Sequence, residues 1–174
     1  TWTTLLMKSI RPGQYLFPGA MAPMGYSLPA AIGASFATDK QVISINGDGG
    51  IQMNIQELAT IKHNKLPIKI VILNNNGYGG VVATQKNFFG GRLSGCTESS
   101  GIGMPDFEKL AYAYGFDYYR INNHEDVEAK LDELFESDNP AICEVMQDFS
   151  QGIEPCVSSR KLEDGTIVST GIDD

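Results

Sequence analysis

The sequence predicts an α/β fold in which a doubly wound, mostly parallel sheet carries helices on both faces. Short apolar runs rich in β-branched residues alternate with stretches of helical periodicity along most of the chain, as in strands joined by helical crossovers. The 174 residues, 42% of them hydrophobic, are enough for one domain with a single core. We therefore expect one domain over residues 1–150, followed by a C-terminal tail over residues 151–174.

Three runs are expected to form buried strands. They are short and apolar, contain β-branched residues and are bounded by Gly, Asn or Pro, as strands inside a parallel sheet usually are. They cover residues 41–46, 68–74 and 140–146. Residues 118–121 form a weaker strand candidate.

Four stretches are expected to form helices, the first because it is rich in alanine and the others because apolar residues recur three or four positions apart. They cover residues 28–37, 55–63, 107–114 and 125–135. The last is expected to start at Asn123 or His124, because a helix N-terminus favours a polar cap and an acidic first turn. Residues 94–103, polar and rich in glycine, are expected to form a long loop.

The net charge of −8 and the pI near 4.7 argue against nucleic acid or an anionic membrane as the main partner. Residues 1–103 carry eight basic and four acidic groups, whereas residues 104–174 carry five and seventeen. An anionic ligand is therefore favoured in the first part, although a solvated acidic helix face in the second part explains the asymmetry equally well. No apolar run approaches the roughly 20 residues of a membrane span.

The cysteines are odd in number, far apart and in no CxxC pair; they are Cys96, Cys143 and Cys156. This usage is typical of reduced thiols in a cytoplasmic protein. Only two histidines, His63 and His124, accompany them, so we expect no zinc site. The chain begins with Thr1 and carries no secretory signal, and we interpret it as part of a longer protein.

Two glycine-containing polar loops, residues 46–50 and 74–80, follow two of the predicted strands. In parallel α/β sheets, ligands bind beyond the carboxyl ends of the strands, which is where both loops fall. Gly47 and Gly49 flank Asp48, so the backbone can turn sharply and present one carboxylate at a helix start. Taken alone, this tripeptide is also typical of an ordinary Asp-Gly turn.

Adjacent parallel strands of equal register are expected to bring Asp48 and Asn75 to the same edge of the sheet. Mg²⁺ prefers oxygen ligands and usually takes one or two carboxylates, with phosphate and water completing the shell. One carboxylate, one amide oxygen and a carbonyl from a glycine-containing turn leave room for two phosphate oxygens. The backbone amides of Gly49 and Gly50 are expected to donate to the same phosphate.

The spacing of the two loops resembles a known signature. Gly47-Asp48-Gly49, then 24 residues, then Asn74-Asn75 resembles the metal- and cofactor-binding motif of thiamine-diphosphate-dependent enzymes. Residues 24–34, 50–61 and 66–73 are similar to the acetohydroxyacid synthase (acetolactate synthase) branch of that family. The resemblance covers about residues 2–146 and implies the thiamine-diphosphate-binding fold, in its C-terminal diphosphate-binding (PP) version.

The resemblance implies a set of site residues. The positions matching the family's Mg²⁺ ligands are Asp48 by its carboxylate, Asn75 by its amide oxygen and Gly77 by its backbone carbonyl. Met24 matches the residue on which the cofactor bends, with a core methionine near a helix start as the structural alternative. The expected cofactor-binding set is Ala22, Met24, Gly47, Asp48, Gly49, Gly50, Asn75, Gly77, Tyr78 and Gly79. Ala22-Pro23 replaces Gly-Ala of the family, and the Ala22 carbonyl is expected to accept from the aminopyrimidine.

The implied activity is that of a carboligase or decarboxylase of the acetolactate synthase type. Such an enzyme decarboxylates a 2-oxo acid such as pyruvate and transfers the resulting carbanion to an acceptor. The family's activating glutamate comes from a separate pyrimidine-binding domain, which these residues lack together with the middle domain. We therefore expect no catalytic residue in this chain, no activity of the chain alone, and a homo-oligomer in the full-length protein.

Residues 78–85 depart from the acetohydroxyacid synthase pattern, because they lack the Met and Trp that shape its substrate entrance. Residues 86–93 and 157–168 resemble acetolactate-synthase-like proteins found with surface-polysaccharide genes. Arg92, Arg160 and Lys161 are candidates to meet an anionic substrate, although exposed basic residues are usually only solvated.

The alternative hypothesis is a non-catalytic α/β module that binds some other phosphate, or a scaffold that keeps the fold without the chemistry. No GxGxxG motif follows the first strand. Asp48 in a phosphate loop would repel an anion unless a cation intervened. Magnesium dependence of binding therefore separates the two hypotheses.

Overall fold

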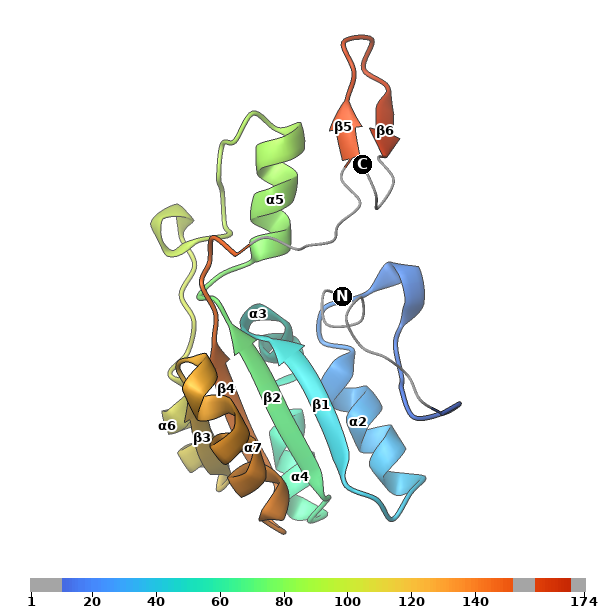
Figure 1. The fold of residues 1–174 in the computed structure, drawn as a ribbon, viewed down its shortest axis with the longest axis vertical. Coiled ribbons are helices and arrows are strands. Elements are labelled where there is room, and N and C mark those ends of the chain that lie inside the picture. Colours follow the sequence, from blue (N-terminus) through green and yellow to red (C-terminus); the bar gives the residue numbers. More distant parts are fainter. Residues whose placement is uncertain (1–10, 152–158, 170–174) are drawn as a thin grey trace. The chain divides into compact units, whose positions relative to one another are not determined.

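The computed structural model describes residues 11–151 and 159–169 (Figure 1). They form two compact units. The first contains the described residues of 1–74 and 104–147, and the second those of 75–103 and 148–174. The boundary therefore falls directly after the first Asn of the Asn74-Asn75 pair.

The first unit contains a parallel sheet in the order β1-β2-β4-β3 (Figure 1). Its strands confirm the predicted ones, the weak candidate at 118–121 included; they are β1 Val42–Gly47, β2 Ile68–Asn74, β3 Asp117–Ile121 and β4 Ala141–Met146. Gly47 at the end of β1 pairs with Leu73 of β2. The carboxyl ends of β1 and β2 therefore lie at the same edge of the sheet.

The four predicted helices are all present, with ends that differ by two residues or fewer. They are α2 Ser27–Phe36, α4 Glu57–His63, α6 Phe107–Tyr114 and α7 Val127–Glu136. Short helical turns complete the unit, namely η1 Gly19–Met21, α3 Asp48–Ile51, η2 Gln52–Asn54 and η4 His124–Asp126. Asn123 caps η4 by accepting from the backbone N–H groups of Glu125 and Asp126, so α7 itself begins at Val127. Within the described ranges, no helix is long and apolar enough to cross a membrane.

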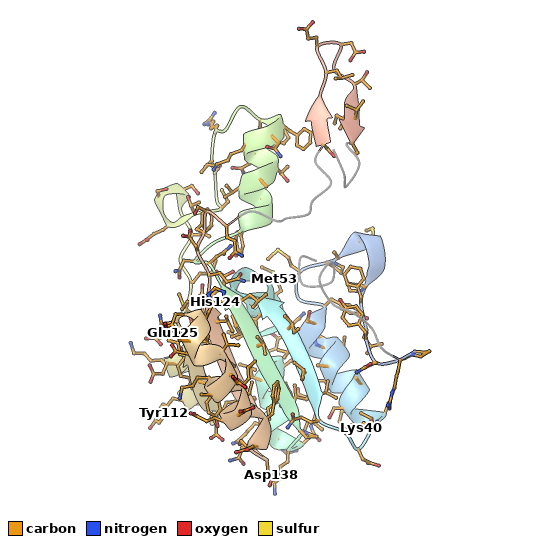
Figure 2. All side chains as sticks on the ribbon, viewed as in Figure 1. Lys40, Met53, Tyr112, His124, Glu125 and Asp138 are labelled. Carbon is orange, nitrogen blue, oxygen red and sulfur yellow. The ribbon has the colours of Figure 1, made fainter. Side chains whose placement is uncertain are left out.

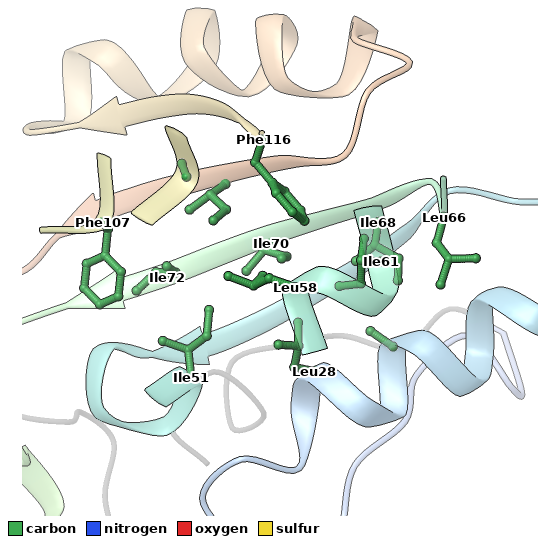
Figure 3. Close-up of a cluster of buried hydrophobic side chains, with 13 residues drawn as sticks. Leu28, Ile51, Leu58, Ile61, Leu66, Ile68, Ile70, Ile72, Phe107 and Phe116 are labelled. Atoms are coloured by element: carbon green, nitrogen blue, oxygen red, sulfur yellow. The ribbon is translucent and has the colours of Figure 1, made fainter. Parts of the chain in front are cut away.

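Helices cover both faces of the sheet, as the sequence predicts. On one face, side chains of α2, α3, α4 and α6 pack on Ile68, Ile70 and Ile72 of β2 and on Ile142 of β4 (Figure 3). On the other face, Leu134 of α7 packs with Ala141 and Cys143 of β4. The fold is therefore α/β with a parallel sheet between two helical layers.

A lysine is buried at the start of β2. Lys69 is 1% exposed, and its Nζ donates to the carbonyl oxygens of Ser137 at 2.6 Å and Asn139 at 2.5 Å. Ser137 is the C-cap of α7, so the ammonium group satisfies carbonyls where that helix ends. Burial lowers the pKa of Lys69, while Asp117 and Asp138 act in the opposite direction.

The second unit contains α5 Gly79–Phe88 and the antiparallel pair β5 Ser159–Lys161 and β6 Ile167–Ser169. Neither α5 nor this hairpin is predicted from the sequence. The hairpin lies in the predicted tail and turns at Gly165, whose φ is +87°. The predicted loop at 94–103 is largely irregular, with one helical turn, η3 Glu98–Ser100.

Leu58 tests the core of the first unit. It lies on α4 and is fully buried in the cluster that packs on Ile68, Ile70 and Ile72 of β2. We expect Leu58→Ala to lower the free energy of unfolding by about 2–5 kcal/mol, because a cavity adds to the lost burial. Tyr112→Ala is the control, since Tyr112 on α6 is 87% exposed and should change stability by only about 0.5 kcal/mol. Urea unfolding measures both, and equal losses in the two variants would contradict the assigned core.

Candidate functional site

The end of β1 presents a buried carboxylate. Gly47 has an extended backbone and precedes α3, whose first residue is Asp48. Asp48 is 3% exposed, and its Oδ1 accepts from the Gly49 backbone N–H at 2.8 Å. A buried negative charge is costly unless it is paired with donors or a cation. The position therefore suits a cation ligand, and Gly47, Gly49 and Gly50 lie beside it in the same turn, as the sequence predicts.

The two asparagines at the end of β2, Asn74 and Asn75, differ in their surroundings. Asn74 is buried, and its Nδ2 donates to Oε1 of Glu144 on β4 at 2.5 Å. Its backbone oxygen accepts from the Gln147 N–H at 2.8 Å. Asn74 therefore ties β2 to β4, whereas Asn75 is the first residue of the second unit.

Gly77 occupies a position that only glycine fits. A Cβ there would lie 2.7 Å from a ring carbon of Phe149 and 2.9 Å from the backbone oxygen of Cys96. The same Cys96 oxygen accepts from the Tyr78 N–H at 3.0 Å. Tyr78 is followed directly by α5, which begins at Gly79. The loop around Cys96 thus braces the segment that contains three of the predicted site residues, Gly77, Tyr78 and Gly79.

Ala22 and Met24 belong to the first unit. Ala22 ends η1 in the left-handed region, with φ +35° and ψ +51°, and its N–H donates to the Gly19 oxygen. A left-handed conformation costs a residue with a Cβ about 1–2 kcal/mol. In the described part of the structure, Met24 is 50% exposed. The alternative interpretation of Met24 as a core methionine is therefore wrong.

A buried polar cluster near the end of β2 was not predicted. Glu144 on β4 is 5% exposed, and its Oε2 accepts from the hydroxyl of Tyr118 and lies 4.0 Å from the guanidinium of Arg120. Burial, followed by the hydrogen bond to Glu144, raises the pKa of Tyr118 well above its usual value. Burial also raises the pKa of the Cys143 thiol to about 11, with a contribution from Glu144. The only sequence signal was an acidic residue inside an apolar strand run.

The remaining candidates show no such convergence. His63 and His124 are exposed, and Figure 2 shows His124 and Glu125 on the outside of the first unit. Arg92 is exposed, while the side chains of Arg160 and Lys161 lie outside the described part of the structure. Cys96 and Cys143 are buried free thiols, while Cys156 lies outside the described residues.

The predicted ligand set consists of oxygen donors, the ligands that a hard cation prefers. Among residues 11–151 and 159–169, no three His, Cys, Asp or Glu side chains gather in a group able to hold a metal ion. The predicted set has one carboxylate, one amide oxygen and one backbone carbonyl, which suits Mg²⁺ shared with phosphate and water. Asp48 belongs to the first unit, and Asn75 and Gly77 belong to the second.

The fold and these loops are those of a cofactor-binding α/β domain, and comparison with known proteins specifies the cofactor. The sequence profile of the C-terminal TPP (thiamine pyrophosphate, or diphosphate) binding domain of thiamine pyrophosphate enzymes matches residues 1–145. The chain belongs to this family, which confirms the resemblance inferred from Gly47-Asp48-Gly49 and Asn74-Asn75.

Within the family, the chain is similar to acetolactate synthases. It is 36% identical over 161 residues to the acetolactate synthase large subunit of Porphyra purpurea, covering 92% of this chain and 27% of that protein. It is 38% identical over 157 residues to the acetolactate synthase isozyme 2 large subunit of Escherichia coli K12, covering 90% and 28%. It is 33% identical over 163 residues to the chloroplastic acetolactate synthase 2 of Nicotiana tabacum, covering 91% and 24%. The chain thus spans about a quarter of the length of these relatives.

Substitution of Gly77 tests the tight packing of its loop. We expect Gly77→Ala to lower the free energy of opening at the Tyr78 amide by about 1–3 kcal/mol, because the added methyl group meets a backbone oxygen that moves only with its loop. Amide hydrogen exchange measures this opening. Gly80→Ala is the matched control, since a Cβ at Gly80 meets nothing within 4 Å. Unchanged exchange at Tyr78 in Gly77→Ala would contradict the assigned packing.

Proposed function

We propose that this chain binds the diphosphate of thiamine diphosphate through Mg²⁺, as part of an acetolactate-synthase-like enzyme. That enzyme would decarboxylate a 2-oxo acid such as pyruvate and transfer the remaining fragment to an acceptor. The observation that carries the proposal is the buried Asp48 at the end of β1, in a chain of the TPP-binding family. The common edge at which β1 and β2 end supports it, because Asp48 and Asn75 directly follow these strands.

Three oxygen donors would hold the metal: the carboxylate of Asp48, the amide oxygen of Asn75 and the carbonyl of Gly77. Backbone N–H groups would complement the phosphate oxygens, because several glycines let the main chain approach closely. These donors come from Gly47, Gly49 and Gly50 after β1, and from Tyr78 and Gly79 at the start of α5. The Gly49 N–H now donates to Asp48, so it would have to exchange this bond for one to phosphate.

The part of the chain before α2 would position the organic part of the cofactor. The Ala22 carbonyl would accept from the aminopyrimidine, and the exposed side chain of Met24 would support the bent cofactor. When bound, thiamine diphosphate supplies the electron sink for loss of CO₂ from a 2-oxo acid. The residues of this chain bind and orient it and neutralise its charge.

The acid–base chemistry is assigned to another part of the protein. We propose that a glutamate of a separate pyrimidine-binding domain activates the cofactor, and that residues 1–150 act as the diphosphate-binding module with 151–174 as its tail. The chain's share of its relatives' length, about a quarter, supports this division. We further propose a cytoplasmic homo-oligomer, and the free thiols of Cys96 and Cys143 favour that compartment.

Titration calorimetry of the full-length protein with thiamine diphosphate, with and without Mg²⁺, tests the proposed site. We expect binding to require the metal, and Asp48→Ala to weaken it by at least about 100-fold, since even groups that only support a metal ligand cost about 10- to 100-fold. Asp39→Ala is the control, because it removes an exposed carboxylate that precedes the start of β1, away from Asp48. This variant should bind thiamine diphosphate like the wild type. Tight binding without Mg²⁺ would favour the non-catalytic phosphate-binding module, and no binding at all would refute the proposal.

Substitution of Met24 distinguishes a residue that contacts the cofactor from one that only stabilises the fold. Because Met24 is half exposed, we expect Met24→Ala to leave the thermal unfolding temperature almost unchanged while it weakens cofactor binding. A core methionine would instead lose about 2–5 kcal/mol of stability. Differential scanning fluorimetry and the same calorimetric titration distinguish the two results.

A further inference from the structure

Glu144 is a buried carboxylate on an interior strand, where an apolar side chain would be expected. Its strand, β4, is paired on one side with β2 and on the other with β3. Replacing a whole buried ion pair by well-packed apolar side chains of similar volume is often neutral or stabilising. General stability therefore does not explain why a carboxylate occupies this position.

The register explains which residues Glu144 joins. Glu144 pairs with Ile72 of β2 and with Arg120 of β3. Asn74 pairs with Met146, two residues after Glu144, and Tyr118 pairs with Ile142, two residues before it. Because side chains alternate between the faces of a sheet, Asn74, Glu144 and Tyr118 lie on the same face. One carboxylate thus links three strands through side-chain hydrogen bonds.

Each oxygen of the carboxylate has its own donor. Oε1 accepts from Nδ2 of Asn74 at 2.5 Å, and Oε2 accepts from the hydroxyl of Tyr118. The Arg120 guanidinium, 4.0 Å from Oε2, adds a positive charge at the more exposed side of the cluster. Because its second oxygen is held by Tyr118, the carboxylate presents Oε1 to Asn74 and so orients the Asn74 side chain.

Asn74 is also fixed through its main chain. Its backbone oxygen accepts from the N–H of Gln147, one residue beyond the end of β4. Both the side chain and the main chain of the last residue of β2 are thus attached to β4. The next residue along the chain is Asn75, the proposed amide ligand of the metal.

We propose that Glu144 is a positioning residue for the Mg²⁺ site, which acts by holding Asn74 and so fixing the point at which the chain leaves β2 toward Asn75. The inference rests on the proposed function and extends it to a residue that contacts neither metal nor cofactor. Tyr118 supports Glu144 in this role by fixing its second oxygen.

The test measures the Mg²⁺ concentration that half-saturates thiamine diphosphate binding to the full-length protein. We expect Glu144→Gln to raise it about 10-fold, because an amide has no charge and only one acceptor oxygen, and so cannot accept from both Asn74 and Tyr118 as the carboxylate does. Tyr118→Phe should raise it less, because the bond between Asn74 and Oε1 remains. Asn74→Ala should raise it as well, and Glu144→Gln should add nothing further in the Asn74→Ala background.

Lys69→Met is the matched control for lost stability. The substitution removes two hydrogen bonds made by a buried polar side chain at the start of β2, the strand that ends with Asn74. We expect it to lower the unfolding temperature without changing the half-saturating Mg²⁺ concentration. The hydrogen-exchange rate of the Asn75 backbone amide in the metal-free protein is a second measurement. We expect this rate to rise in Glu144→Gln and to stay unchanged in Lys69→Met.

The outcomes separate this inference from the proposed function. Wild-type binding that depends on Mg²⁺, with the same half-saturation in Glu144→Gln as in the wild type, would overturn the positioning role and leave the site intact. A change in Glu144→Gln that persists undiminished in the Asn74→Ala background would also overturn it. Absence of Mg²⁺-dependent binding in the wild type would overturn both. If Glu144→Gln does not fold, Tyr118→Phe and Asn74→Ala decide, and unchanged half-saturation in both refutes the inference.

Discussion

The burial of β2 on both faces is the constraint on which the first unit depends. This strand lies between β1 and β4, and Ile68, Ile70 and Ile72 on one of its faces are completely buried. Each such side chain contributes about 1.5–3 kcal/mol when it is removed from water. Val71, on the other face, packs against the cluster that contains Leu134 of α7 and Cys143 of β4. A strand that is apolar on both sides requires a helical layer on each side, and the chain supplies both layers.

Strand β2 carries a buried polar side chain near each of its ends. Lys69 at its start binds carbonyl groups near the end of α7, whereas Asn74 at its end binds Glu144. Because β1 runs parallel to β2, the buried Asp48 follows β1 at the edge where Asn74 lies. A parallel register thus places a cation at one end of the strand and leaves acceptor oxygens at the other, before any ligand is considered.

Most of the fold could be predicted because local pattern and tertiary environment agree. The strands are short β-branched runs, α6 and α7 have clear apolar periodicity and α2 is rich in alanine, so the ends of these elements differ little from expectation. Helix α5 could not be predicted, because Gly79 and Gly80 at its start disfavour a helix and its apolar residues show little periodicity. The motif residues Asp48 and Asn75 were recognisable from spacing. The role of Glu144 was not, because it depends on the register of three strands, which one sequence does not reveal.

The enclosed ammonium group of Lys69 has a consequence for the chemical reactivity of the protein. Amine-directed reagents attack the neutral, accessible form of lysine, and the buried Nζ is held by two carbonyl oxygens. Exposed lysines such as Lys40, which Figure 2 shows beside the start of β1, are open to such reagents in the folded protein. Labelling of Lys69 requires the packing between β2 and the end of α7 to open. The rate at which Lys69 is labelled therefore reports how often this part of the sheet opens.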